Sequence, residues 1–358
     1  MAEEENDIFQ YAAQMQCQEL HLFLNQAIGI KAIVAIHDTT LGPALGGCRC
    51  IEYSSVQAAF TDAIRLAQAM TYKAAIPRLP LGGGKMVLLK PRQIKNRTDY
   101  FKAAGNFVET LNGRYITAVD SGTSVQDMDI IATQTSHVTS ISKRAFSIAD
   151  PSVMTAKGAE RGIRAAVQFK LGKSSLYGLH ITIQGLGHVG YHLAKNLFTA
   201  GAKLTVYDVN PEAVRRCVVE FGAKAVTSLE ELLQRECDVF APCALGAILN
   251  NDSISMLKAP IVAGIANNQL EDSKHGKLLL ARDILYAPDY VINSGGFIYV
   301  AAQHSHMSET EAEQKIEDIY DTLMEIFQRA KSKNLPTNTV ADLIALEHLK
   351  NAKAEQKI

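Results

Sequence analysis

Apolar residues recur along the first 120 residues with two different spacings, which separate strands from a helix. Short apolar runs at 32–36 and 86–89 predict two strands, and residues 114–120 predict a third. Between the first two runs, residues 56–73 place apolar side chains three and four positions apart, which predicts a helix that buries one face. Ser54 or Ser55 can cap its amino end. This part of the chain therefore predicts a mixed set of strands and helices.

A regular alternation of strands and helices begins after residue 148. Asp150 and Pro151 predict a helix start, since aspartate caps helices and proline suits their first turn, and this helix is expected to end near Phe169. Strands are then predicted at 180–184, 203–207, 238–240, 261–263 and 290–292. From about Glu309 the chain is predicted to be helical. Alternation of this kind is typical of a doubly wound parallel sheet.

The length of the chain and the change of pattern near residue 148 together predict two domains. At 358 residues, a single core would be crowded. We predict an α/β fold with two domains separated by a cleft, residues 1–148 and 149–332. The second is expected to be a Rossmann-type doubly wound parallel sheet, and residues 333–358 are expected to return to the first domain.

The segment 180–190 runs from a predicted strand straight into the pattern G-x-G-x-x-G, which opens a helix. Gly185 would make the tight turn, Gly187 would let backbone amides approach a pyrophosphate, and Gly190 would let helix and strand pack closely. The helix start adds free N–H groups and a positive dipole end. A purely structural glycine turn is the alternative. The candidate cofactor contacts are Gly185, Leu186, Gly187, His188, Val189 and Gly190.

An acidic residue and two polar loops follow the next predicted strands. Asp208 lies 18 residues beyond Gly190, where a carboxylate would hydrogen-bond ribose hydroxyls and repel a 2′-phosphate. NAD is therefore predicted rather than NADP. The loops 242–246 and 266–269 follow apolar strands and would also border the site, although ordinary polar loops are the alternative. Their candidate cofactor contacts are Ala244, Leu245, Asn267 and Asn268.

Two lysines lie next to apolar residues or glycines, where a lysine that is simply exposed to solvent is not expected. Lys73 follows Met70 by three positions, so it continues the apolar face of its helix and is either snorkelling or receiving an anion. Lys85 follows three glycines and precedes an apolar strand. Desolvation or a second ammonium nearby would lower the pKa of Lys85, and such a lysine can act as a general acid or base. The spacing of the glycines before Lys85 does not match the P-loop pattern, so a P-loop is excluded.

Asp120 ends the strand predicted at 114–120. Alternation along a strand places it on the same face as Ile116 and Ala118. A carboxylate at a strand end is a candidate site group. A turn aspartate before Ser121 and Gly122 is the alternative.

Composition adds exclusions. The net charge of −1 and the 20% of charged residues argue against a polybasic nucleic-acid binder. The acidic amino terminus does not predict a secretory signal, and the apolar runs are shorter than the roughly 18 residues of a membrane span. Six scattered cysteines indicate reduced thiols and a cytoplasmic location. No metal site is predicted, because Cys48 and Cys50 lack a second Cys/His pair at zinc-like spacing.

Several ordered motifs together resemble the Glu/Leu/Phe/Val dehydrogenase family, and most of all its leucine-oxidising members. The matching stretches are 42–47, 70–73, 82–85, 112–117, 241–246, 266–270 and 286–296. The resemblance implies reversible oxidative deamination of an L-amino acid to a 2-oxo acid and ammonia, with NAD as hydride acceptor. It also implies a homo-oligomer, with octamers usual among the leucine-oxidising members. Residues 1–148 would then bind the substrate and form the subunit contacts, and residues 149–332 would bind NAD.

The resemblance assigns roles to residues of the first domain. Lys73 would hold the substrate carboxylate, with backbone help near Gly46 and Gly47. Lys85 would be the acid/base that activates water against the imino acid. Asp120 would work with Lys85 in proton transfer around the amino group.

Two residues of the second domain also receive roles from the resemblance. Asn293 would lie near the substrate amine and the nicotinamide ribose, and Thr155 near the nicotinamide amide. The reaction also needs a dry site, which two domains can provide by hinge closure.

The side-chain pocket implied by the resemblance is apolar throughout. It comprises Leu45, Met70, Ala118, Ile316 and Ile319. An apolar pocket excludes a glutamate-type side chain, which would be left unpaired. Ala118 favours a branched aliphatic substrate, since family members acting on aromatic amino acids tend to have a smaller residue there. For the last two isoleucines, three positions apart on one expected helix face, core packing is the alternative.

Three departures from the resemblance keep other functions open. Val119 stands where Glu is usual, Ser121 where Val is usual, and Val153 where close members have a second proline. A phenylalanine or tryptophan dehydrogenase is one alternative. A catalytically lapsed NAD-binding regulatory protein is the other.

Overall fold

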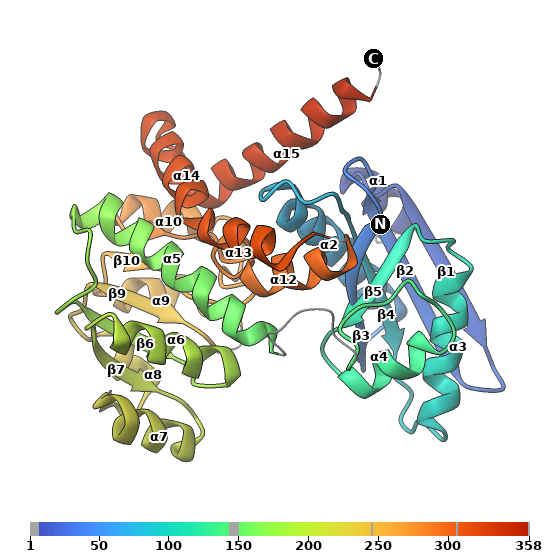
Figure 1. Cartoon of the computed structure of the whole chain (residues 1–358), viewed down its shortest axis with the longest axis horizontal. Coiled ribbons are helices and arrows are strands. Elements are labelled where there is room, and N and C mark those ends of the chain that lie inside the picture. Colours follow the sequence, from blue (N-terminus) through green and yellow to red (C-terminus); the bar gives the residue numbers. More distant parts are fainter. Residues whose placement is uncertain (1–6, 143–149, 245, 306, 357–358) are drawn as a thin grey trace, which may run out of the picture. The chain divides into compact units, whose positions relative to one another are not determined.

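The computed structural model describes residues 7–142, 150–244, 246–305 and 307–356 of the chain. Its internal contacts divide the chain into two compact units, 1–147 with 303–306 and 345–358, and 148–302 with 307–344. Each unit has its own sheet, with helices packed against it (Figure 1). Within the described ranges, no helix is both long enough and apolar enough to cross a membrane.

The first unit is built on a five-stranded mixed sheet in the order β1-β2-β4-β3-β5. Its strands are β1 (Glu19–Asn25), β2 (Ile30–Asp38), β3 (Ala44–Ile51), β4 (Gly82–Leu89) and β5 (Tyr115–Val119). β1, β2 and β4 are antiparallel neighbours, whereas β3 lies parallel to both β4 and β5. One face is covered by α1 (Ile8–Gln14) and α2 (Val56–Ala75), and the other by α3 (Arg97–Glu109) and α4 (Val125–Ala132).

The helix predicted at 56–73 is α2, and its contact with the sheet depends on a glycine. Ser55 rather than Ser54 caps it, because the Ser55 hydroxyl accepts the backbone N–H of Ala58 at 3.0 Å. A Cβ on Gly83 of β4 would come within 2.1 Å of the backbone nitrogen of Thr71. The missing side chain therefore lets α2 lie directly on β4.

The second unit contains an all-parallel six-stranded sheet in the order β11-β10-β9-β6-β7-β8. Its strands are β6 (His180–Gln184), β7 (Lys203–Tyr207), β8 (Lys224–Ala225), β9 (Val239–Pro242), β10 (Ile261–Val262) and β11 (Leu285–Tyr286). Strands are added on both sides of β6, so the predicted doubly wound Rossmann-type sheet is confirmed.

Helices pack against this sheet and extend beyond it. One face is covered by α8 (Leu229–Leu233), α9 (Asn251–Met256) and α10 (His275–Ala281). The other helices are α5 (Pro151–Leu171), α6 (His188–Thr199), α7 (Pro211–Phe221), α11 (Asp289–Ile292), α12 (Gly295–His304), α13 (Glu309–Glu317), α14 (Ile319–Lys333) and α15 (Thr337–Glu355). The start predicted for α5 is confirmed, since the Asp150 carboxylate accepts the Ser152 N–H at 2.9 Å.

One predicted strand is wrong. Residues 290–292 form part of the short helix α11, and the strand at this sheet edge is β11, a few residues earlier. The Asp289 carboxylate accepts the N–H groups of Tyr290 and Gln269, which fixes a turn where an extended strand would need a ladder partner. An apolar run this short fits a buried helix as well as a strand.

The last helix, α15, contains residues of both compact units. α15 begins in the second unit, while residues 345–358 group with the first. His348 Nδ1 lies 2.9 Å from the carbonyl oxygen of Ala75, and the Lys353 ammonium lies 3.0 Å from the Asp38 carboxylate. The division thus falls at 344/345, whereas 332/333 was expected. The boundary expected at 148/149 lies outside the described residues, and the roles of the two domains stay predictions.

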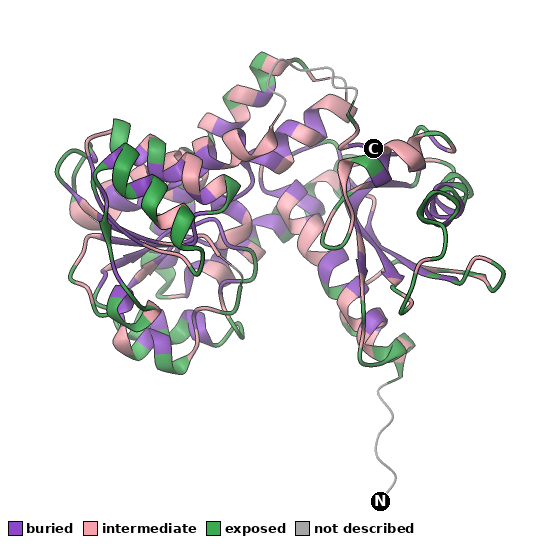
Figure 2. Ribbon diagram, turned by 90° about the horizontal axis from the view of Figure 1, so that it is seen from below, coloured by how far each residue is buried: buried purple, intermediate pink, exposed green. Residues whose placement is uncertain are grey.

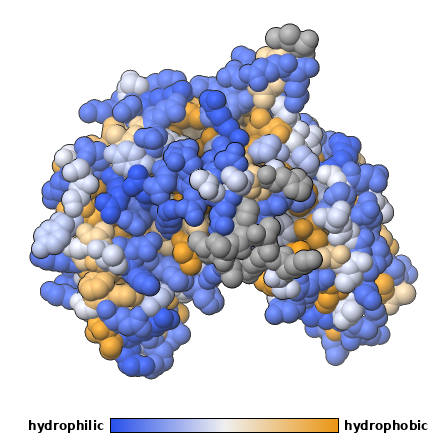
Figure 3. Space-filling view, in the orientation of Figure 1, coloured by the Kyte–Doolittle hydropathy of each residue, from blue (hydrophilic) through white to orange (hydrophobic). Residues whose placement is uncertain are grey.

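The buried residues lie mainly in the sheets and beside them (Figure 2), and the face of the molecule seen in Figure 3 is mainly polar. Buried positions gather in the strands and on the helix faces turned toward them (Figure 2). On the face in Figure 3 hydrophilic residues predominate, with scattered apolar ones. On the edge strand β1, the side chains of Leu22 and Leu24 are 64% and 61% exposed.

Candidate active site

Three strands bring the predicted catalytic groups of the first unit onto one face of its sheet. The register pairs Gly47 of β3 with Ala118 of β5 and places Lys85 of β4 on the other side of Gly47. Because side chains alternate along a strand, Asp120 projects from the same face as Ala118. Val87, two residues after Lys85, packs against α2, so this is the face that α2 covers.

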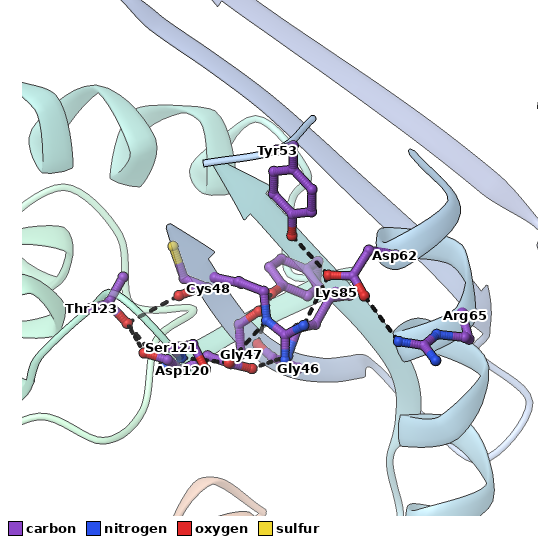
Figure 4. A network of polar contacts seen from close by, with 12 residues as sticks. Gly46, Gly47, Cys48, Tyr53, Asp62, Arg65, Lys85, Asp120, Ser121 and Thr123 are labelled. Carbon is purple, nitrogen blue, oxygen red and sulfur yellow. Dashed lines mark hydrogen bonds and ion pairs between the residues drawn. The ribbon is translucent and has the colours of Figure 1, made fainter. Parts of the chain in front are cut away.

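Lys85 and Asp120 form an ion pair in this layer (Figure 4). Their side chains are 5% and 17% exposed. Burial, the largest effect, lowers the pKa of Lys85 below its ordinary value, although the Asp120 carboxylate opposes this shift. Burial alone would raise the pKa of Asp120, but the charges of Lys85 and Arg49 outweigh it and hold that pKa below its ordinary value. The lysine therefore gives up its proton more readily than a solvated one.

The turn after β5 fixes the direction of the Asp120 side chain. The backbone N–H of Ser121 donates to Asp120 Oδ1, and the N–H of Asp120 itself donates to Thr123 Oγ1 at 3.0 Å. Thr123 Oγ1 in turn donates to the carbonyl oxygen of Cys48 at 3.0 Å, which ties the turn to β3 (Figure 4). The turn therefore holds both the backbone and the side chain of Asp120.

Two glycines of β3 leave the room that this arrangement needs. A Cβ on Gly47 would lie 2.7 Å from both the Cβ and the Oδ2 of Asp120. A Cβ on Gly46 would lie 1.7 Å from the carbonyl oxygen of Gly84. The Gly46 carbonyl oxygen also accepts the buried Tyr115 hydroxyl at 2.7 Å. Neither position can carry a side chain without displacing the sheet or Asp120.

The remaining predicted substrate contacts of this unit lie on α2 and β3. Lys73 is half-buried in the last turn of α2, and Met70 is half-buried one turn earlier. Their spacing puts both on the same helix face as Asp62, whose carboxylate contacts β3. Leu45 of β3 is 1% exposed and lies on the same sheet face as Gly47. The predicted carboxylate-binding lysine thus lies on the helix face that is turned toward the sheet.

The glycine loop after β6 has the geometry of a pyrophosphate-binding turn. Gly185 has a φ of +97°, and a Cβ there would lie 2.5 Å from the backbone nitrogen of Ala244. A Cβ on Gly190 would lie 2.2 Å from the Gly185 carbonyl oxygen. By contrast, nothing lies within 4 Å of a Cβ on Gly187, the amino cap of α6, which has no side-chain capping bond. An open, uncapped helix start offers its N–H groups to a phosphate.

The residues around this loop also fit a dinucleotide. Leu186 is buried, while His188 and Val189, in the first turn of α6, are exposed and half-buried. Asp208 Oδ2 accepts the Leu186 N–H at 2.6 Å, so the carboxylate after β7 lies at the edge of the loop. Its remaining lone pairs can accept ribose hydroxyls, and its charge disfavours a 2′-phosphate.

The loops after β9 and β10 end at the same edge of the parallel sheet. A Cβ on Gly246 would lie 2.3 Å from the Asn267 carbonyl oxygen, so the two loops are in contact. Asn267 and Asn268 are exposed. The buried Asn293 amide donates to Asn267 Oδ1 at 2.8 Å and to the Ile265 carbonyl oxygen at 3.2 Å. Leu245, also predicted here, lies outside the described residues.

Three further predicted residues lie on helices of the second unit. Thr155 Oγ1 donates to the Pro151 carbonyl oxygen at 3.1 Å near the start of α5. Ile316 and Ile319 are both buried, but the expectation that one helix carries them is wrong, because α13 ends before Asp318 and α14 begins after it. Ile319 packs against Gly158 of α5, a core contact. Their role in substrate binding stays a prediction.

No metal site emerges from the geometry of the described residues. Among them, no group of three or more His, Cys, Asp or Glu is arranged to hold an ion. Cys48 and Cys50 are buried in the core between the sheet and α3.

Family models match most of the chain. A model described as the dimerisation domain of Glu/Leu/Phe/Val dehydrogenases matches residues 14–137, and one described as glutamate/leucine/phenylalanine/valine dehydrogenase matches residues 208–357. The chain belongs to this family. Leucine dehydrogenase of Geobacillus stearothermophilus is 48% identical over 344 residues, which cover 96% of this chain and 93% of the relative.

Other members of the family are also similar. Phenylalanine dehydrogenase of Caldalkalibacillus thermarum is 38% identical over 348 residues, 96% of this chain and 92% of the relative. The crystal structure of L-tryptophan dehydrogenase from Nostoc punctiforme has a TM-score of 0.87 at 39% identity and covers 97% of this chain and 99% of its own. As a member of the Glu/Leu/Phe/Val dehydrogenase family, the chain is an NAD-dependent L-amino acid dehydrogenase, and the predicted family, enzyme class and cofactor are confirmed.

Two neighbours of the site in this dehydrogenase were missed by the sequence analysis. Arg49 lies on β3 with its Nε 3.3 Å from Asp120 Oδ1 and its Nη1 2.9 Å from Asp62 Oδ2. The signal was present, since Arg49 follows Leu45 and Gly47 at the spacing of one strand face. Gln269 is fully buried and donates to two carbonyl oxygens of the loop after β10, at 2.8 and 3.0 Å. No motif marked it.

Proposed function

We propose that this enzyme oxidises branched-chain L-amino acids, leucine together with valine and isoleucine, to 2-oxo acids and ammonia, and catalyses the reverse reaction. The apolar surface beside Lys85 carries this proposal. Leu45, Ile116 and Ala118 project from the same sheet face as Lys85, and the first two are at most 1% exposed. Ala118 is half-buried, so an apolar substrate side chain could contact it without leaving a polar group unpaired, whereas a carboxylate would lose its hydration.

The proposed chemistry uses two lysines in different protonation states. Lys73 would bind the substrate carboxylate as a cation, with the backbone of Gly46 and Gly47 beside it. Lys85 in its neutral form would take a proton from the water that attacks the imino acid. Asp120 would carry protons to and from the amino group. The burial of Lys85 and its contact with Asp120 support this assignment.

In the second unit, residues at the carboxyl edge of the sheet would hold the cofactor. The N–H groups of the loop 185–190 would bind the pyrophosphate, and Asp208 would bind the adenosine ribose. Thr155 and Asn293 would border the nicotinamide, together with Ala244, Asn267 and Asn268 on the adjoining loops. NAD, when bound, accepts the hydride from the α-carbon of the substrate.

A substrate panel tests the proposal. NADH formation is followed by absorbance at alkaline pH with leucine, isoleucine, valine, phenylalanine, tryptophan and glutamate, and Lys85→Ala is the control for the catalytic lysine. We expect the highest kcat/KM with the branched aliphatic substrates. These should differ among themselves by no more than about 10- to 200-fold, because one methylene is worth only ~1–3 kcal/mol. Absence of turnover on every amino acid, with NADH still bound, would reveal a lapsed enzyme.

An aromatic substrate is the second candidate, and the names of two relatives favour it. Ala118 decides between the two in physical terms, because its methyl group occupies volume that a larger ring would need. We expect Ala118→Gly to raise kcat/KM for phenylalanine relative to leucine. A wild-type kcat/KM for phenylalanine or tryptophan well above that for leucine would overturn the branched-chain proposal. Met70, half-buried on α2, is the matching pocket position to vary next.

We also propose that the enzyme is a homo-oligomer, in the form of an octamer. The family description of residues 14–137 as a dimerisation domain supports association. The exposed leucines 22 and 24 on the edge strand β1 provide apolar surface of the kind that subunit contacts bury. Sedimentation velocity measures the mass directly, and a species of monomer mass only would refute the proposal.

A further inference from the structure

The Asp120 carboxylate is shared by two cations that come from different strands. Its Oδ2 accepts the Lys85 ammonium from β4, and its Oδ1 lies 3.3 Å from Arg49 Nε on β3. The three side chains are between 5% and 19% exposed, so their charges interact with little screening by water. Only one of the two cations can give up its proton, since a guanidinium stays charged at any working pH.

Arg49 is itself held from the side opposite to Asp120. Its Nη1 donates to Asp62 Oδ2 of α2 at 2.9 Å. The same oxygen accepts the Tyr53 hydroxyl at 2.7 Å, and Figure 4 shows Tyr53 directed at Asp62. The Asp62 side chain is 13% exposed. The guanidinium therefore spans two carboxylates, and its planar fork fits this task better than a flexible ammonium.

We propose that Arg49, anchored by Asp62, is a positioning residue that keeps Asp120 ionised and directed at Lys85 while Lys85 gives up and regains its proton. The inference rests on the proposed roles of Lys85 and Asp120. A carboxylate alone beside a lysine would favour the charged lysine and oppose its use as a base. A second, permanent cation on the same carboxylate offsets that pull and repels the lysine charge. The balance leaves Lys85 as the group that titrates.

The other charged or titratable groups near Lys85 come from each element packed around it. They are Asp62 on α2, Cys48 on β3, Asp120 after β5, and, further along the same layer, Lys73 on α2 and His37 on β2, the last bonded to Thr71. Burial raises the pKa of the Cys48 thiol well above its ordinary value, so it stays neutral. Arg49 is thus the one fixed cation among the described groups that contacts Asp120 without being the proposed base.

The pH dependence of kcat/KM for leucine oxidation tests this inference. In wild type, kcat/KM rises with pH as Lys85 loses its proton. In Arg49→Met, we expect this ascending limb to move to higher pH and kcat/KM at neutral pH to fall about tenfold. Arg49→Gln should move the limb in the same direction. Arg49→Lys keeps the charge but cannot span both carboxylates, so the limb should stay near its wild-type position while kcat falls.

Arg65→Met is the matched control. Arg65 touches Asp62 Oδ1 at 3.3 Å from the solvent side, with a side chain 57% exposed, and has no contact with Asp120. Removal of the Arg65 side chain should leave the ascending limb of kcat/KM at its wild-type pH. If all three Arg49 variants lose activity equally at every pH, or if Arg65→Met moves the limb as far as Arg49→Met does, the residue is merely structural and the inference is overturned. Circular dichroism establishes that each variant is folded, and Arg49→Gln replaces Arg49→Met if the latter is not.

A measurement without turnover separates this inference from the proposed function. Competitive acetylation with a trace of acetic anhydride, read by mass spectrometry, gives the pH at which the Lys85 amine becomes half reactive. We expect this midpoint to rise in Arg49→Met. If wild type oxidises no amino acid, the proposed function has failed, while the midpoint still decides on Arg49. An unchanged midpoint overturns the inference whether or not the enzyme turns over.

Discussion

Substitution of Gly47 by alanine should reduce activity, whereas a control substitution with a similar cost in stability should not. The added methyl group would lie 2.7 Å from Asp120 Oδ2, the oxygen that Lys85 contacts. An ordinary van der Waals contact begins near 3.4 Å, so the carboxylate or β3 must move by at least about 0.7 Å. A displacement of about 1 Å at reacting groups can cost 10²-fold in rate. We therefore expect Gly47→Ala to lower kcat/KM for the amino acid by about 10- to 100-fold.

The matching control is Gly29→Ala in the same unit. Gly29 has a φ of +76° and open space around its Cβ position, so alanine there adds backbone strain of about 1–2 kcal/mol without touching Asp120. Gly47→Ala should cost a similar ~1–3 kcal/mol from overpacking. Urea denaturation and steady-state kinetics are measured on both variants, with the KM for NAD as an internal check. If Gly47→Ala retains activity within threefold of wild type, Asp120 does not need its observed position and the reasoning fails.

Three further substitutions probe charges in both units. The pKa of Asp120 is lower in the folded than in the unfolded state, where it is about 3.9. The stability that Asp120 contributes is therefore present above about pH 3.9 and is lost as the pH falls through the folded-state pKa. The difference in melting temperature between wild type and Asp120→Asn should become smaller below about pH 4. Asp208→Ser should raise the KM for NAD about tenfold and narrow the preference over NADP, and an unchanged cofactor ratio would count against its ribose role. Lys353→Ala removes an exposed cation from the buried Asp38 and should cost about 1 kcal/mol or less in urea titrations, an effect that 1 M salt reduces.

Most of the architecture could be predicted from the sequence because it depends on local patterns. The strands of the second unit at 180–184 and 203–207 match β6 and β7, since each is an apolar run next to a glycine or an aspartate. The strand expected at 290–292 failed for the opposite reason. Its residues are apolar, but Pro288 and the bonds of Asp289 to distant and adjacent N–H groups start a helix there.

The missed part of the site depends on contacts between distant residues. Arg49 meets Asp62, 13 residues away on a helix, and Asp120, 71 residues away at the end of another strand. The contact with Asp120 cannot be predicted until the order of β4, β3 and β5 is known, and the contact with Asp62 depends on how α2 packs on the sheet. The glycines in the sequence indicated where the backbone lies close to other atoms. They did not show which side chain fills the space, as Asp120 does beside Gly47.

Because Lys85 and Arg49 share the Asp120 carboxylate, replacement of Lys85 is expected to cost little stability. Breaking a buried ion pair costs about 3–5 kcal/mol when it leaves a charge unpaired. Lys85→Met leaves none, because Asp120 keeps the Arg49 guanidinium, and the methionine fills similar space with apolar atoms. We expect Lys85→Met to be inactive yet within about 1 kcal/mol of wild type in urea denaturation, or more stable. Asp120→Ala orphans Lys85 and should cost about 3 kcal/mol. Equal losses in both variants would mean that Arg49 does not support Asp120 when the lysine is gone.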